Sequence, residues 1–349
     1  MKSLKSILFL ITVVLFSISC GKSEEKAGEV KSESKGSLTF YAGLQEDHAA
    51  MIAKEFEMET GIKTSFVRMS SGEVLARLKA EKNNMSSSVW YGGPIDAFVA
   101  ANEEGLIEKY SSPEAANIKP EFKSEDGTWN GIYVGYLGFV GNEEILKEKG
   151  LEMPQSWEDL LKPEYKGEIV VAHPGSSGTA YTMLATVVQL MGEDAAMEYF
   201  KKFNGQVRQY TKSGTAPGRM VGQGETTIGI TFLHDAIKYK KEGYKDIIIS
   251  APEEGTGFEI GGVALLKNGP NPDEAKQFID WVLTKEVQEK GQTVGSFQFL
   301  TNMNAIPPEE AMTIKDTKLI DYDFDWAGKN RVRLVERFSE ETSTTAPTK

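Results

Sequence analysis

Short strand-like runs alternate with helical patterns along most of this chain, and that alternation limits the folds open to it. Predicted strands at residues 38–41, 63–68 and 89–91 are each followed by apolar residues at helical spacing. The same order returns in the second half, where strands are predicted at 168–172, 206–211, 227–232 and 246–250. Strand, turn and helix repeated in this way are typical of a parallel α/β sheet covered by helices.

Two longer apolar runs interrupt the alternation. Residues 131–141 and residues 259–267 are apolar and punctuated by glycine, and each is a candidate for a strand that crosses between two lobes. We therefore expect an α/β fold with two lobes joined by two crossover strands. Lobe one is predicted at residues 37–137 plus 260–338, and lobe two at residues 138–259. A chain of 349 residues is long enough for two such cores.

Charge and composition exclude several classes of function. The formal net charge is −12, which disfavours general nucleic-acid binding because that binding depends on neutralising phosphates with Lys and Arg. The sequence has one cysteine and three histidines. These numbers exclude a disulfide framework and a Cys-rich zinc site, and they disfavour a His-rich metal centre. We expect no cofactor and no metal site.

The N-terminal segment predicts export. Lys2 and Lys5 precede an apolar run at 7–18 that is too short to span a bilayer as a helix but suits a signal peptide. The small residue Ser19 stands just before Cys20, as in a bacterial lipoprotein signal. We expect residues 1–19 to be removed and Cys20 to carry lipid; a plain secretory peptide is the alternative. The polar segments 20–36 and 339–349 predict a disordered tether and a disordered tail.

Three Ser/Gly/Thr turns, each just before a predicted helix, are candidates for an anion site. They are Ser70-Ser71-Gly72, Ser176-Ser177-Gly178-Thr179 and Ser213-Gly214-Thr215. Helix N-termini have free N–H groups and partial positive charge, and hydroxyls add donors for a phosphate or carboxylate. Simple N-capping is the alternative for any one turn. No Walker A lysine pattern accompanies the turns, so a nucleotide-hydrolysing P-loop is not supported.

A second candidate group is His234-Asp235, directly after a predicted strand, together with Glu259 among glycines. No Gly-x-Ser-x-Gly motif supports an esterase, and one His with one carboxylate is too few ligands for zinc. Hydrogen bonding to a polyol remains as a functional use, beside a helix N-cap role for the aspartate. Gln45 and Glu46, at the first strand-to-helix junction, are further candidates for the cleft.

Several stretches together resemble bacterial ABC-transporter substrate-binding proteins of the iron(III)-binding type. They are the lipoprotein signal and tether and residues 41–61, 166–190, 209–216 and 227–235. The resemblance implies a two-lobed clamshell that closes on a ligand and delivers it to a permease in the inner membrane. It also implies a monomer in the periplasm or cell envelope that is not an enzyme. Iron-binding members carry an adjacent tyrosine pair where this chain has Leu233-His234-Asp235.

The sequence is similar to family members that bind hexose 6-phosphates, through its SSGTAY, QYTKSG and HDA runs and its EGTGFEIG stretch. This resemblance implies a separate role for each of three sets of residues. The phosphate is expected at Ser176, Ser177, Gly178, Thr179, Thr211, Ser213 and Gly214. The sugar is expected at His234, Asp235 and Glu259. The closing lobe is expected to contribute Ser70, Ser71, Gly92, Gly93, Gln45 and Glu46.

Other functions stay open at this point. A ferric-iron binder of the same family, or a binder of pyridoxal phosphate, thiamine or a phosphonate, is compatible with the same fold. A secreted phosphatase and a purely structural surface lipoprotein are the alternatives from other classes.

Overall fold

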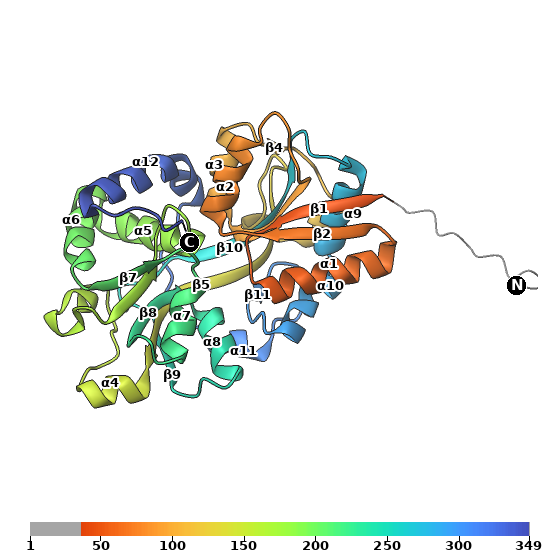
Figure 1. The fold of residues 1–349 in the computed structure, drawn as a ribbon. Helices are drawn as coiled ribbons and strands as arrows, with labels where there is room; N and C mark the ends of the chain where they lie inside the picture. Colours follow the sequence, from red (N-terminus) through yellow and green to blue (C-terminus); the bar gives the residue numbers. More distant parts are fainter. Residues whose placement is uncertain (1–35, 349) are drawn as a thin grey trace, which may run out of the picture. The chain divides into compact units, whose positions relative to one another are not determined.

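The strands of this protein form one continuous path of parallel and antiparallel neighbours, in the order β2-β1-β3-β10-β5-β8-β6-β7. The structure is a computed structural model that describes residues 36–348, which belong to one compact unit (Figure 1). The predictions for the signal peptide, for Cys20 and for nearly all of the tether lie outside the described residues. None of the helices in residues 36–348 combines the length and apolarity that a membrane span requires.

The first part of the path is parallel. Strand β1 pairs with both β2 and β3, and a helix follows each of these three strands as the alternation predicts. Apolar residues on both faces of this sheet form separate core clusters, one centred on Phe40 and Phe278 and one on Trp90 and Phe98. The elements are β1 (Ser37–Ala42), α1 (Glu46–Thr60), β2 (Lys63–Arg68), α2 (Ser71–Ala80), β3 (Val89–Pro94), α3 (Ile95–Glu103) and β4 (Ile107–Glu108).

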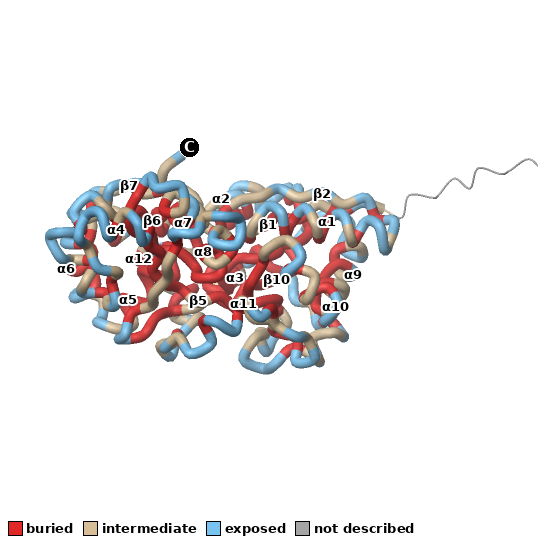
Figure 2. The backbone as a smooth tube through the Cα atoms, turned by 90° about the horizontal axis from the view of Figure 1, so that it is seen from below, coloured by how far each residue is buried: buried red, intermediate tan, exposed pale blue. Residues whose placement is uncertain are grey.

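Two strands connect this sheet to the rest of the molecule. Strand β5 (Asn130–Asn142) pairs through its first half with β10 (Phe258–Leu266) and through its second half with β8 (Ile228–Phe232). The change of partner falls between Tyr136, opposite Phe258, and Leu137, opposite Phe232. Figure 1 shows β5 and β10 side by side between the two lobes, and Figure 2 shows both strands buried. The predicted α/β fold with two crossover strands is confirmed.

The second lobe surrounds a sheet in which β6 lies between β7 and β8 and is parallel to both. Its core contains Trp157, Tyr181 and Phe200. The elements are α4 (Glu143–Lys149), β6 (Ile169–Ala172), α5 (Gly178–Met191), α6 (Glu193–Asn204), β7 (Val207–Thr211), α7 (Ala216–Gly222), α8 (Leu233–Lys241) and β9 (Ile247–Ser250).

The remaining segments follow β10. They are α9 (Pro272–Val282), α10 (Lys285–Lys290), β11 (Phe299–Leu300), α11 (Glu309–Met312) and α12 (Phe324–Thr342). Short 3-10 helices lie in the connections at Pro113–Asn117, Pro120–Phe122, Glu158–Leu161, Pro163–Tyr165 and Gly291–Val294.

The last helix, α12, contacts both lobes. It lies against α3, α5 and α6, and its Leu334 and Phe338 belong to the core of the second lobe. A buried ion pair joins Arg331 of α12 to Asp96 of α3, with 2.6 Å between Nη1 and Oδ1. The sequence groups residues up to 338 with lobe one and predicts a tail from 339. These domain boundaries stay a prediction, although the helix itself continues to Thr342.

Candidate functional site

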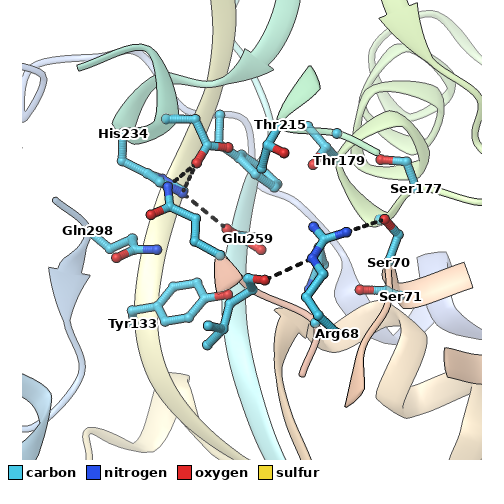
Figure 3. A pocket seen from close by; sticks show the side chains of 18 residues that line it. Arg68, Ser70, Ser71, Tyr133, Ser177, Thr179, Thr215, His234, Glu259 and Gln298 are labelled. Carbon is cyan, nitrogen blue, oxygen red and sulfur yellow. Dashed lines mark hydrogen bonds and ion pairs between the residues drawn. The ribbon is translucent and has the colours of Figure 1, made fainter. Parts of the chain in front are cut away.

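A polar cavity of about 40 Å³ lies between the two lobes, where strands end and helices begin (Figure 3). Its walls come from the ends of β1, β2 and β8, from the starts of α2, α5 and α8, and from the crossover strands. The predicted residues that line it are Gln45, Ser70, Ser71, Ser177, Gly178, Thr179, Gly214, His234, Asp235 and Glu259. The structure therefore brings together members of all three predicted groups.

The starts of α2 and α5 meet at one side of the cavity. The backbone N–H of Gly72 in α2 donates to the carbonyl of Ser176 at 3.1 Å, so the two lobes touch directly here. A β-carbon on Gly72 would lie 2.4 Å from the Gly175 carbonyl oxygen, and one on Gly178 would lie 2.8 Å from Pro94 Cδ. Only glycine allows this approach. Two helix N-termini, each partly positive, therefore face the same small space, which favours an anion between them.

Arg68 adds a full positive charge on the same side of the cavity. It ends β2, and its guanidinium donates to the Leu44 carbonyl at 3.2 Å and to the hydroxyls of Ser70 and Ser213 at 3.4 Å each. It makes no ion pair with any residue that the structure describes. A guanidinium has a planar fork of donors that matches a phosphate or carboxylate. Arg68 was not predicted for the site because an arginine at a strand end belongs to no motif.

The opposite wall carries three buried titratable groups. His234 Nε2 lies 3.7 Å from Asp235 Oδ1 and 3.9 Å from Glu259 Oε1, and each of these residues is at most 3% exposed. Burial lowers the pKa of the His234 imidazole, against the opposing effect of Asp235. Burial, with the nearby carboxylates of Asp235 and Asp96, raises the pKa of Glu259 well above its ordinary value. This wall has hydrogen-bonding groups suited to hydroxyls.

Two further residues on this wall were not predicted for the site. Tyr133 of β5 and Gln298, just before β11, both line the cavity. The Tyr133 hydroxyl accepts a hydrogen bond from the Gly93 N–H at 3.0 Å. Thr215, part of a predicted turn, also lines the cavity. Figure 3 shows Arg68, Ser70, Ser71 and Ser177 on one side, and His234, Tyr133 and Gln298 on the other.

Polar side chains join the lobes beside the cavity. The Gln45 amide donates to Asp235 Oδ1, and its carbonyl accepts from Lys238 Nζ at 3.2 Å. Lys238 also forms an ion pair with Asp47, with 2.7 Å between Nζ and Oδ2. Gln45 and Asp47 lie at the start of α1, whereas Asp235 and Lys238 belong to α8. These contacts hold the two lobes together at the edge of the site.

Six predicted residues do not line the cavity. The hydroxyls of Ser176 and Thr211 donate to backbone carbonyls, of Lys212 at 2.9 Å and of Ser213 at 2.9 Å. Their hydrogen bonds hold the turns in place and leave no free donor for a ligand. Glu46 and Ser213 line a neighbouring recess that also contains Arg219. Gly92 and Gly93 lie behind the wall, with φ of +83° and +91°, a backbone conformation that favours glycine.

Among residues 36–348, no group of three or more His, Cys, Asp and Glu side chains is arranged to hold a metal ion. At the place where the resembling iron binders carry their tyrosine pair, the buried residues are Leu233, His234 and Asp235.

Two α/β lobes, two crossover strands and a polar cavity between the lobes define a two-lobed binding protein of the periplasmic type. The chain belongs to the family of bacterial extracellular solute-binding proteins, whose model matches residues 95–329. Members of this family carry solutes rather than transform them, and the family implies a periplasmic location and delivery to an ABC permease.

Three relatives illustrate the range of similarity. The periplasmic binding protein AfuA from Actinobacillus pleuropneumoniae, solved with exogenous fructose-6-phosphate bound, is 44% identical, with a TM-score of 0.86 over 89% of this chain and 100% of that one. An uncharacterized protein of Haemophilus influenzae is 42% identical over 89% of this chain and 92% of its own length. The Fe(3+)-binding periplasmic protein of Serratia marcescens is 23% identical over 87% and 89%.

Proposed function

We propose that this protein is the substrate-binding component of an ABC importer and captures a small phosphorylated sugar, most simply a hexose 6-phosphate. The observation that carries the proposal is the polarity of the cavity. One side holds two helix N-termini and an arginine that has no carboxylate partner among the described residues, and the other side holds His234, Asp235 and Glu259. The relative solved with fructose-6-phosphate supports the same class of ligand.

The phosphate belongs on the side of Arg68. Its oxygens accept hydrogen bonds from the guanidinium, from the hydroxyls of Ser71 and Ser177, and from free N–H groups at the starts of α2 and α5. Charge-assisted hydrogen bonds of this kind contribute about 1.5–3 kcal/mol each when they are buried. Since Arg68 and α2 come from one lobe and α5 from the other, the phosphate is held completely only when the lobes are closed.

The sugar belongs on the side of His234. Carboxylate oxygens of Asp235 accept from sugar hydroxyls, and the amide of Gln298 both donates and accepts. The cavity of about 40 Å³ is far smaller than the roughly 300–1,000 Å³ of ordinary ligand pockets. Binding therefore requires the lobes to separate and the Gln45 amide to leave Asp235. No covalent bond forms or breaks, so the protein acts as a carrier and not as an enzyme.

The cellular setting follows from the N-terminal sequence and the family. Lipid on Cys20 would hold the protein at a membrane of the cell envelope, and residues 21–36 would act as a tether. The monomer would deliver its ligand to an inner-membrane permease. We do not propose ferric iron as the ligand, because Leu233, His234 and Asp235 stand where the resembling iron binders carry their tyrosine pair.

Isothermal titration of ligand-free protein with glucose 6-phosphate, fructose 6-phosphate, glucose and inorganic phosphate tests the proposal. Arg68→Gln should weaken the binding of both sugar phosphates and of inorganic phosphate about 10- to 100-fold, because one charge-assisted contact is lost. Asp235→Asn should weaken the binding of the sugar phosphates and leave the binding of inorganic phosphate unchanged. Arg208→Gln, a change of an exposed arginine in β7, serves as the matched control. Wild-type protein that binds none of the four compounds would contradict the proposal.

A further inference from the structure

Three titratable groups, His234, Asp235 and Glu259, lie together on one side of the cavity. They are so close that two negative charges among them would repel each other. Glu259 of β10 and Asp235 of α8 approach the same imidazole nitrogen, at 3.9 Å and 3.7 Å. The backbone of Gly135 in β5 closes the space behind them, since a β-carbon there would lie 2.6 Å from His234 Nδ1 and 3.1 Å from Glu259 Oε1. The geometry leaves little room for water to screen the carboxylates.

The groups that face Glu259 from neighbouring elements are mostly acidic or neutral. They are Asp235 and His234 of α8, Tyr133 of β5 and Asp96 of α3. No Lys or Arg among residues 36–348 forms an ion pair with Glu259. Arg331 forms its ion pair with Asp96, and the guanidinium of Arg68 donates to Leu44, Ser70 and Ser213. Burial and the two aspartates raise the pKa of Glu259 accordingly.

We propose that ligand capture by this protein is coupled to the uptake of one proton, which Glu259 holds in the closed, ligand-bound site. The inference rests on the proposed function. In the open protein, water reaches Glu259 and its carboxylate is ionised at neutral pH. Closure removes that water and adds a phosphate of about −1.5 to −2 charge to a site that already holds Asp235. The carboxylate takes a proton from solvent and becomes a neutral acid, and no other bond changes.

The proton also changes what Glu259 does for the ligand. A carboxylate only accepts hydrogen bonds, whereas a carboxylic acid donates one and still accepts. The neutral form therefore suits a sugar hydroxyl that itself accepts and donates. By linkage, uptake of one proton makes affinity fall as pH rises, by up to tenfold per pH unit where the open form is fully ionised.

Isothermal titration with glucose 6-phosphate at pH 7.5, in buffers of different ionisation enthalpy, counts the protons taken up. The second pKa of the phosphate is near 6, so the ligand is almost fully ionised at this pH. Wild-type protein should take up close to one proton per ligand, and its dissociation constant should rise up to tenfold between pH 7.5 and 8.5. Glu259→Gln should take up almost none and lose the pH dependence, whatever its affinity.

Glu164→Gln, at an exposed carboxylate outside the site, is the matched control and should take up as many protons as the wild type. Wild-type binding without proton uptake would overturn the inference and leave the proposed function standing. That result does not depend on whether the Glu259→Gln variant folds. Equal uptake by the wild type and Glu259→Gln would likewise overturn it. Absence of glucose 6-phosphate binding would refute the proposed function and the inference together.

Discussion

Gly72→Ala should weaken ligand binding, because it hinders closure of the lobes, without lowering the stability of the ligand-free protein. Gly72 lies in the first turn of α2, and its backbone has ordinary helical geometry there. An added methyl group would meet the carbonyl oxygens of Gly175 and Ser176 at 2.4 Å and 2.8 Å. Both obstacles are backbone atoms of the other lobe and cannot swing away as a side chain can. The lobes of the variant therefore have to stay about 1 Å further apart, because contacts of this kind need about 3.5 Å.

The expected loss of affinity has two parts. The hydrogen bond of 3.1 Å from the Gly72 N–H to the Ser176 carbonyl is lost, at about 0.5–1.5 kcal/mol. At least one charge-assisted contact to the phosphate is lost as well, at about 1.5–3 kcal/mol. The sum is about 2–4.5 kcal/mol, which corresponds to roughly 30- to 2,000-fold weaker binding. Stability of the ligand-free protein should be unchanged or slightly higher, because alanine favours helix more than glycine does.

Isothermal titration with glucose 6-phosphate and thermal unfolding without ligand measure the two quantities. Gly205→Ala is the matched control, because Gly205 also has right-handed helical geometry and lies at the end of α6, away from the cavity. Its affinity should equal that of the wild type. Wild-type affinity in the Gly72→Ala variant would refute the reasoning, since it would mean that ligand binding does not need the contact between α2 and α5.

Two other contacts between elements give further predictions. Asp47→Asn removes the negative charge that pairs with Lys238 across the cleft. Because Asp47 is largely exposed, we expect the closed state to lose at most about 1 kcal/mol, which stopped-flow experiments would detect as up to fivefold faster ligand dissociation. An unchanged rate would show that this ion pair does not hold the lobes together. Arg331→Met leaves Asp96 buried without a partner and should lower the free energy of unfolding in urea by about 3–5 kcal/mol, with partial recovery on adding Asp96→Leu. Wild-type stability in the single variant would contradict this account.

The fold could be predicted from the sequence because its signals are local. Strand and helix periods alternate, and the glycine-punctuated run that forms β5 is too long for an ordinary strand of one lobe. No helix is predicted from the sequence at Phe324–Thr342, however. What stabilises α12 is packing of Leu334 and Phe338 against residues more than a hundred positions earlier, such as Phe200. No local pattern shows that contact.

The sequence identifies several of the turns that line the candidate cavity, but it does not show which of their side chains face it. A Ser/Gly/Thr turn indicates a helix start, yet only the structure shows that Ser177 lines the cavity while the Ser176 hydroxyl is used by a backbone carbonyl. Arg68 was missed for a related reason. Its role depends on which elements surround the end of β2, and the nearest of these include Ser213, far away in the sequence.

The position of α12 also affects the order in which the parts of the protein can fold. The core around β6, α5 and α6 includes Leu334 and Phe338, which are synthesised more than a hundred residues after those three elements. While Leu334 and Phe338 are missing, the apolar surface that they cover stays open to water. The second lobe therefore cannot finish folding during synthesis of its own segment. The core of the second lobe is complete only once α12 has been synthesised.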